Sequence, residues 1–261
     1  MRLLMIGDIV GRPGRKAIRE ILPRLVKSHK VDFVLANGEN AAGGNGITWD
    51  IADELFSYGI DVLTTGNHVW DKREVFDFIN DQPRVIRPGN YPPGSPGNGS
   101  GVFSDLRGVK VGVVNLSGRV FLPALDCPFR KADEILTGIG QETPIIVLDF
   151  HAEATSEKMA MGWYLDGRVS AVVGTHTHVQ TADERVLPGG TAYISDVGMT
   201  GPRDSVIGVK KEIIVDRFLT HMPRRFEVAS GPYQFNAVLL DLDEVDGRAN
   251  SIDRLFITEE G

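Results

Sequence analysis

The chain has 261 residues, 42% hydrophobic and 24% charged, which is the composition of an ordinary globular protein with a sizeable core. Its 35 acidic residues against 28 basic ones give a net charge of −7, which argues against a broad surface for nucleic acid or an anionic membrane; a local basic patch stays open. Cys127 is the single cysteine, which excludes an intramolecular disulfide and a thiolate cage, so any metal would need nitrogen and oxygen ligands.

The N-terminal apolar run, MRLLMI, is short and passes straight into Gly7 and Asp8. We therefore expect neither a signal peptide nor a membrane span, and predict a cytoplasmic protein. One domain over residues 1–261 is expected, because α/β architectures commonly form units of about 250 residues. Whether the chain forms a homo-oligomer stays open.

Short apolar runs that break at Gly, Asn, Asp or His alternate with amphipathic stretches. The runs are rich in aliphatic and β-branched residues and predict buried strands at 3–8, 33–39, 62–68, 111–116, 145–151, 171–178 and 192–198. Helical spacing of apolar residues predicts helices at 16–29, 50–58, 72–79 and 156–165. Strands that alternate with helices indicate βα units and an α/β fold.

Two segments depart from this alternation. Residues 85–104 are dense in Gly, Pro, Asn and Ser, which predicts a long loop, an excursion near the functional site. Whether this loop closes over the site as a lid stays open. After residue 225, two strand-like runs separated by an Asp-Gly turn predict a hairpin, which we expect on a sheet edge.

Polar side chains follow most of the predicted strands. They are Asp8, Glu39, Asn40, Asn67, His68, His151, His176 and His178. Each alone would be an ordinary turn former, helix cap or surface histidine. In α/β sheets, however, ligands bind at the carboxyl ends of the strands, so these side chains are expected to converge on one pocket.

Carboxylate, amide and imidazole groups without thiolate suit Mn, Fe or Zn, and the set is too large for one ion. A two-metal site is the economical interpretation. Two such cations lower the pKa of a bridging water and stabilise the attacking and leaving oxygens of a phosphoryl group. This is the chemistry of phosphoesterases.

The motifs resemble those of the calcineurin-like metallophosphoesterases, which run D-x-H, G-D-x-x, G-N-H-[D/E], a lone His and G-H-x-H. The counterparts cover nearly the whole chain: Gly7-Asp8, Gly38-Glu39-Asn40, Gly66-Asn67-His68, His151 and Gly174-Thr175-His176-Thr177-His178. Val10 stands where the superfamily has its first His, and the amide oxygen of Asn40 can supply the missing ligand. The stretches GENAAGG, GNHVWD, NLSGRVF and SDVGMTGP resemble the YmdB-like branch, a bacterial group.

The resemblance implies a four-layer α/β/β/α sandwich of two mixed sheets, with the metal site at the carboxyl ends of the strands. It also implies a phosphodiesterase that hydrolyses small 2′,3′-cyclic nucleotides through a metal-bridging hydroxide. One metal would be held by Asp8, Glu39, Asn40 and His178, and the second by Glu39, Asn67, His151 and His176. Iron or manganese is expected, with zinc as an alternative, because an amide is a harder donor than imidazole.

His68 follows Asn67 directly and is our candidate for the general acid that protonates the leaving alkoxide. Asp71 could orient it, or could simply be a helix N-terminal acid favoured by the dipole. Arg12, in a Gly/Arg/Pro segment before a helix, could hold a phosphate oxygen, and a solvated loop charge is an equal alternative. The resemblance also places Thr200 on the substrate side of the pocket.

Three classes of function stay open. The first is the cyclic-nucleotide phosphodiesterase, which could also act on cyclic phosphates at RNA 3′ ends. The second is a phosphomonoesterase or nuclease on the same metals. The third is a regulatory protein whose metal site is structural. A spare His68 beside a complete ligand set favours retained catalysis, since a structural site needs no such acid.

Overall fold

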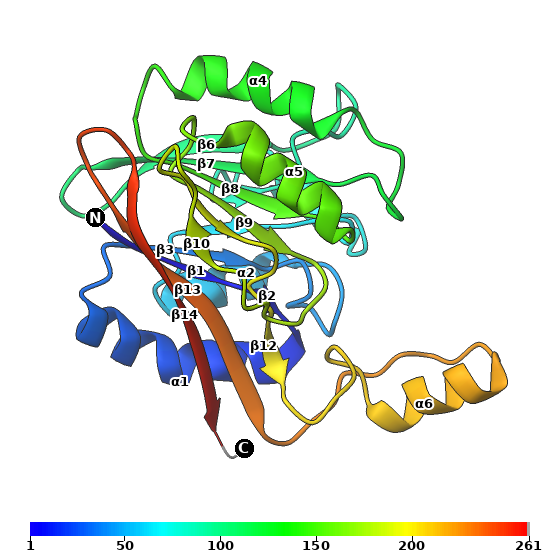
Figure 1. Ribbon diagram of the computed structural model, residues 1–261. Coiled ribbons are helices and arrows are strands. Elements are labelled where there is room, and N and C mark those ends of the chain that lie inside the picture. Colours follow the sequence, from blue (N-terminus) through cyan, green and yellow to red (C-terminus); the bar gives the residue numbers. More distant parts are fainter. Residues whose placement is uncertain (260–261) are drawn as a thin grey trace.

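The computed structural model describes residues 1–259, which form a mixed α/β structure with two mixed β-sheets (Figure 1). The larger sheet has the strand order β2-β12-β13-β1-β3-β4-β5, with β14 paired to β13. Its strands are β1 (Arg2–Ile6), β2 (Asp8–Ile9), β3 (Phe33–Asn37), β4 (Val62–Thr64), β5 (Val85–Ile86), β12 (Met199–Pro202), β13 (Tyr233–Leu242) and β14 (Ala249–Glu259).

The smaller sheet has the order β10-β11-β9-β8-β7-β6. Its strands are β6 (Ser100–Ser104), β7 (Lys110–Ser117), β8 (Ile146–His151), β9 (Ala171–Thr175), β10 (Arg185–Val186) and β11 (Ala192–Ile194). Within each sheet the central strands are parallel: β1, β3, β4 and β5 in one, and β7, β8, β9 and β11 in the other. In each sheet the carboxyl ends of these parallel strands therefore lie on the same side.

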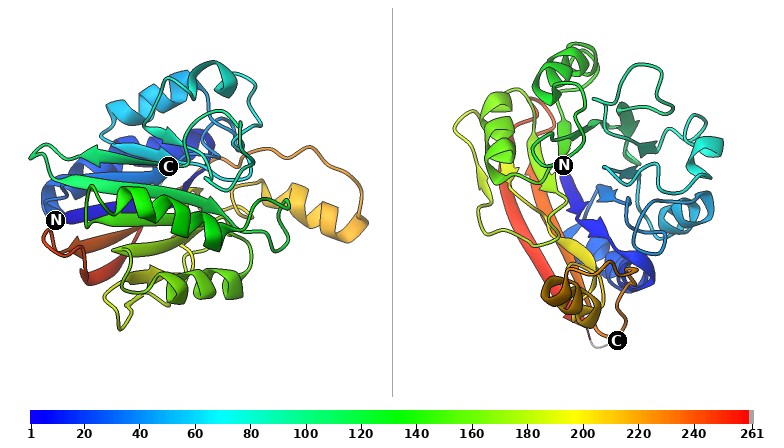
Figure 2. Two further views of the ribbon diagram at one scale, coloured as in Figure 1. Left: turned by 90° about the horizontal axis from the view of Figure 1, so that it is seen from above. Right: turned by 90° about the vertical axis from the view of Figure 1, so that its right-hand side faces the viewer.

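Helices cover the outer faces of both sheets. The larger sheet packs against α1 (Gly11–His29), α2 (Trp49–Ser57) and α3 (Val75–Phe78), and the smaller sheet against α4 (Pro128–Ile139) and α5 (Thr155–Leu165). In Figures 1 and 2, α1 lies on the opposite side of the two sheets from α4 and α5. A third apolar cluster, which includes Leu3 and Met5 from β1 and Val113 and Val147 from the smaller sheet, fills the space between the sheets.

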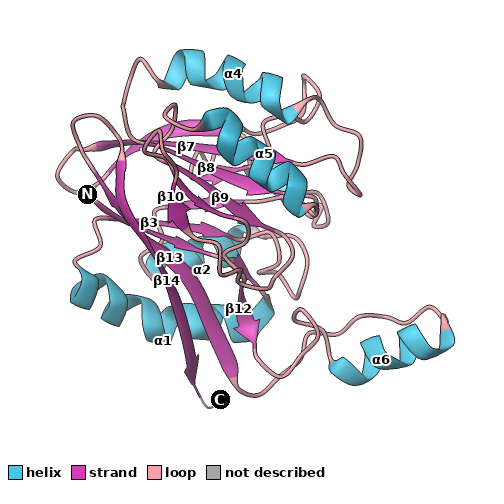
Figure 3. Cartoon of the chain, viewed as in Figure 1, coloured by secondary structure: helices cyan, strands magenta, loops and turns pink. Residues whose placement is uncertain are grey.

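The remaining helix, α6 (Lys211–Thr220), extends away from these layers (Figure 3). It buries Ile214 but leaves Phe218 and Leu219 exposed. No helix in residues 1–259 combines the length and the apolar character that a bilayer span requires.

All seven predicted strand segments contain a strand, and all four predicted helices are present with shifted ends. The first helix begins at Gly11 rather than at Lys16 and continues through Pro23. The helices α4 and α6 were not predicted. The α4 segment has apolar residues at helical spacing that pack into the core, among them Ala132 and Ile139, so its signal was present in the sequence and was overlooked. The α6 segment buries only Ile214 and shows no clear apolar face.

The prediction of a loop over 85–104 was wrong at both ends, because these ends form β5 and β6. The loop itself spans 87–99 and carries the chain from the larger sheet to the edge of the smaller one. The Arg87 guanidinium holds it by donating to the carbonyls of Pro88, Ser95 and Pro96. No residue of 87–99 lines the pocket described below, but Tyr91 packs edge-on against Trp70, two residues after His68, with ring centres 5.6 Å apart. The expected excursion near the site stays a prediction.

The predicted hairpin is confirmed as β13 and β14. Gly247 of the Asp-Gly turn has φ of +75°, which favours glycine. β14 pairs with β13 along its length, and β13 pairs on its other side with β1 and β12, so the hairpin closes one edge of the larger sheet.

Candidate metal centre

The carboxyl ends of strands from both sheets meet at one place and bring the predicted ligands together. The larger sheet contributes Asp8 in β2, Glu39 and Asn40 after β3, and Asn67 after β4; the smaller sheet contributes His151 at the end of β8 and His176 and His178 after β9. Oxygen donors thus come from one sheet and nitrogen donors from the other.

One part of the site is centred on the buried imidazole of His151. Its Nε2 lies 3.0 Å from Glu39 Oε1, 2.9 Å from Asn67 Oδ1 and 3.0 Å from His176 Nδ1. Ligand atoms of Glu39, His151 and His176 all lie within 4.8 Å of one another. Three donor atoms this close to one another, with Asn67 Oδ1 beside them, suit a metal ion.

The other part contains Asp8, Asn40 and His178. His178 Nε2 lies 3.2 Å from the Asn40 amide nitrogen and 3.7 Å from Asp8 Oδ1. Asp8 Oδ1 is buried and has no hydrogen-bond partner within residues 1–259. A buried carboxylate oxygen without a partner is costly, and a cation would satisfy it. If the Asn40 side-chain amide is rotated by half a turn, its oxygen faces His178 in place of its nitrogen. The residues therefore fit a metal here too.

Glu39 lies between the two parts, since its Oε1 is also 3.4 Å from the Asn40 amide nitrogen. Gly66 permits the close approach of Glu39 and His151. A Cβ atom at residue 66 would lie 2.3 Å from His151 Cδ2 and 2.5 Å from Glu39 Oε2. Any side chain at this position would push the two donors apart.

The charges of the cluster are strongly coupled. Burial alone raises the pKa of Glu39, but the neighbouring His151 outweighs it and lowers this pKa to about 2. Burial lowers the pKa of His151, but Glu39 outweighs it and raises this pKa to about 9. Burial and His151 together lower the pKa of His176 to about 3. A cation that binds here therefore displaces a proton from His151.

A buried polar chain orients His151 from behind. Its Nδ1 donates to Thr175 Oγ1 at 3.0 Å, and the Thr175 hydroxyl donates to Asp149 Oδ1 at 2.7 Å. Burial raises the pKa of Asp149 to about 6. This chain directs Nε2 of His151 toward the cluster. Sequence reasoning missed it, although Asp149 lies two residues before His151 and so on the same face of β8.

A second buried support, also missed, holds the turn that carries the other two histidines. His176 and His178 have φ values of +100° and +65°, which non-glycine residues rarely adopt. Between them, the Thr177 N–H and hydroxyl both donate to Asp196 Oδ2, at 3.0 and 2.7 Å. The buried Lys158 amine lies 2.7 Å from the same oxygen.

His68 lies beside the cluster, and its side chain is 39% exposed. Its Nδ1 lies 2.8 Å from Asp71 Oδ2, so the predicted contact with Asp71 is present. Asn45 donates to the same carboxylate oxygen at 2.9 Å. The His68 backbone N–H donates to Glu39 Oε2 at 3.0 Å, which ties His68 to the cluster of donor side chains.

A pocket of about 540 Å³ lies over these residues and is lined by Glu39, His68, His176 and His178 among others. Glu153 also lines it, with Oε2 3.0 Å from His176 Nε2. This contact was not predicted. Its signal in the sequence is the position of Glu153, two residues after His151.

The structure does not place the two predicted substrate contacts in this pocket. Thr200 is fully buried, and its hydroxyl bonds the backbone of Asn236, so the prediction of a substrate contact was wrong. Arg12 is exposed, but in the first turn of α1, where it lines a neighbouring cavity.

Residues 4–255 match the YmdB-like protein family. A Bacillus subtilis (strain 168) protein named 2′,3′-cyclic-nucleotide 2′-phosphodiesterase is 53% identical over 260 residues, which cover 100% of this chain and 98% of that protein. The structure of a hypothetical protein from Thermus thermophilus matches with a TM-score of 0.93 at 43% identity and covers 99% of this chain and 100% of that chain. A structure described as a novel phosphatase from Mycoplasma pneumoniae matches with a TM-score of 0.93 at 33% identity and covers 100% of this chain and 94% of that chain. The expected relationship is thus confirmed, and this chain belongs to the YmdB-like protein family.

Proposed function

We propose that the chain is a metal-dependent phosphoric ester hydrolase that opens 2′,3′-cyclic nucleotides, with a calcineurin-like fold acting as one domain. The convergence of two carboxylates, two amides and three imidazoles beneath one pocket is the observation that carries the proposal. The name of the Bacillus subtilis relative supports the choice of substrate.

Two metal ions fit the donor set. Asp8, Asn40 and His178 would hold one ion, Asn67, His151 and His176 the other, and Glu39 would serve both. Iron or manganese is favoured over softer metals by the oxygen-rich side of the site. When bound, these ions supply Lewis-acid chemistry, which lowers the pKa of water and neutralises charge on the phosphoryl oxygens.

In the reaction, a water oxygen bonds to phosphorus and the bond from phosphorus to O2′ breaks, which leaves a 3′-phosphate. The departing O2′ needs a proton. Asp71 accepts the Nδ1 proton of His68, so Nε2 is the ring nitrogen available to the pocket and can deliver that proton. Glu39 positions His68 through the backbone N–H, so the acid and the metal cluster keep one geometry.

The test is to measure initial rates of metal-stripped and Mn-reloaded or Fe-reloaded protein on 2′,3′-cyclic, 3′,5′-cyclic and monoester nucleotides. Selective, metal-restored cleavage of the 2′,3′-cyclic diester to the 3′-phosphate is expected. Turnover of monoesters alone would reassign the chain as a phosphomonoesterase. Metal binding without turnover of any substrate would point to a structural or regulatory site.

A further inference from the structure

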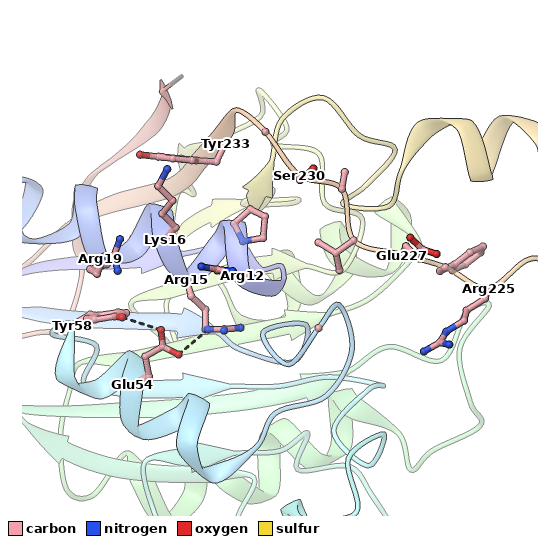
Figure 4. Close-up of a pocket in the computed structure, with 16 residues that line it drawn as sticks. Arg12, Arg15, Lys16, Arg19, Glu54, Tyr58, Arg225, Glu227, Ser230 and Tyr233 are labelled. Carbon is pink, nitrogen blue, oxygen red and sulfur yellow. Dashed lines mark hydrogen bonds and ion pairs between the residues drawn. The ribbon is translucent and has the colours of Figure 1, made fainter. Parts of the chain in front are cut away.

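A second cavity, of about 1180 Å³, lies beside the pocket over the candidate metal centre (Figure 4). We call it the basic groove. Its lining includes residues 12, 13, 15, 16 and 19 of α1 and residues 225–231 of the segment before β13. The groove and the pocket share Gly43, Phe226, Glu227 and Val228, so one leads into the other.

The groove is positive although the whole chain has a net charge of −7. Five cations line it, against two carboxylates: Arg12, Arg15, Lys16, Arg19 and Arg225 against Glu54 and Glu227. A local excess of positive charge in an acidic protein favours a specific anionic ligand over a general attraction to polyanions.

Both carboxylates are already paired. Glu54 accepts from Arg15 at 2.8 Å, and Glu227 accepts from Lys210 at 2.5 Å. By contrast, Arg12, Lys16 and Arg225 make no ion pair with any carboxylate of residues 1–259. The Lys16 amine instead lies 5.2 Å from the centre of the Tyr233 ring. Figure 4 shows this side chain pointing toward the ring. All three cations lack a direct ion pair, although Glu20 attracts Lys16 and Glu227 attracts Arg225 at longer range, so their donors remain available for phosphate oxygens.

The spacing of the cations suits consecutive phosphates. Arg12 and Lys16 are at i and i+4 on one face of α1, about 6 Å apart along the helix at about 1.5 Å per residue, whereas Arg19 is paired with Glu20 at 3.2 Å. That length corresponds to roughly two nucleotides of a stacked strand at about 3.4 Å each. Phe226 is 47% exposed on the wall shared with the pocket, with the Arg217 guanidinium 4.9 Å from its ring centre, and its exposed part offers a surface on which a base can stack.

We propose that the basic groove binds the phosphate backbone of a single-stranded oligoribonucleotide whose 3′-terminal 2′,3′-cyclic phosphate lies in the pocket. This inference rests on the proposed function and extends its substrate class from mononucleotides to RNA ends. A 2′,3′-cyclic phosphate occurs only at a 3′ end, so the chain leaves the pocket in one direction. A single positive groove that enters the pocket from one side fits that requirement.

The test compares kcat/KM for a 2′,3′-cyclic mononucleotide and for a four-nucleotide RNA with the same terminus, as a function of salt. The variant Lys16→Gln/Arg225→Gln removes one cation from each wall of the groove. Lys27→Gln/Lys30→Gln, at the far end of α1, removes the same charge outside it. Binding of a fluorescent 3′-phosphorylated RNA of the same length is measured in parallel and needs no turnover.

We expect the RNA to be the better substrate at low salt. The groove variant should lose about tenfold in RNA affinity at 0.1 M salt, and its salt slope should become shallower by about 1.4, which is two contacts at about 0.7 each. Its rate on the mononucleotide and both rates of the control should stay unchanged. Equal loss in both double variants, or equal competition by inorganic tripolyphosphate, would overturn the assignment to RNA. If neither substrate is cleaved but the groove variant alone loses RNA binding, the proposed reaction is contradicted. The assignment of the basic groove as an RNA-binding site is then still supported.

Discussion

The two sheets contribute different chemistry to the same site. The larger sheet supplies only oxygen donors, from Asp8, Glu39, Asn40 and Asn67, whereas the smaller sheet supplies only imidazoles. Most of the contact between them is an apolar layer, joined behind the site by buried hydrogen bonds such as that from the Thr64 hydroxyl to Asp149 Oδ2 at 2.5 Å. Metal binding therefore depends on how the sheets pack, because neither sheet alone carries a mixed donor set. The predictions below test each side of this division, from the largest effect to the smallest.

Glu39→Gln should remove the activity almost completely. Glu39 is the donor from the larger sheet that touches both parts of the cluster, and the substitution removes its charge with little change in shape. Initial rates and the number of bound metal ions per chain measure the effect. The exposed Glu142→Gln changes the net charge equally and should behave as wild type. Full activity of the Glu39 variant would rule out its role in metal binding.

His68→Gln should lower kcat by about 10²-fold to 10⁴-fold, the usual contribution of a general acid. Metal content should be retained, because His68 stands beside the cluster and Glu39 accepts only its backbone N–H. Single-turnover rates and metal analysis separate the two effects. Loss of metal together with rate would make His68 a ligand rather than an acid. Asp71→Asn should also lower kcat, but by a smaller factor.

Thr175→Val should weaken metal binding by about 10-fold to 100-fold through the buried polar chain that supports His151. The change breaks the link from His151 to Asp149 and leaves every proposed ligand side chain in place. The matched control is Thr143→Val, a buried threonine whose hydroxyl bonds the Lys110 carbonyl far from the site. Metal titrations distinguish them, and equal losses in both variants would assign the effect to stability.

Metal affinity should rise with pH by at most about tenfold per unit and level off above about pH 9. Glu39 raises the pKa of His151 from its ordinary value of 6.5 to about 9, so below that pH the metal must displace a proton. The attraction between Glu39 and protonated His151 also adds to the free energy of unfolding of the metal-free protein. This contribution is complete below pH 6.5 and is lost as the pH rises through about 9. Titration calorimetry in buffers of different ionisation enthalpy measures the released proton. An affinity independent of pH would contradict the Glu39 and His151 pairing.

The sequence was sufficient to predict which residues converge, because each predicted ligand follows a strand whose apolar period is clear. It was not sufficient to assign the strands to sheets. β1 lies between β3 and β13, and β13 follows β1 by more than 200 residues, so no local pattern carries that pairing. Thr200 was misplaced for the same reason, since β12 packs it toward Asn236 of β13.

The residues that support the site were harder to predict than the ligands. Asp149 and Asp196 lie within or just after buried strands, where the role of a carboxylate is known only once the residue that binds it is known. Thr175 and Lys158, their respective partners, come from other elements. Such pairs depend on tertiary contacts, which spacing along a single chain does not reveal.

The strand order has a consequence for the time at which the site forms during synthesis. Asp8 is made among the first residues, but it lies in β2, which pairs with β12, and β1 completes its pairing only with β13. All seven proposed donors have been synthesised by residue 178, yet the sheet that holds four of them waits for residues 199–242. We expect metal to bind only when the chain is nearly complete, because strand pairs between residues far apart in sequence form late in folding. A nascent chain that stalls before β12 would carry every donor and still bind no metal tightly.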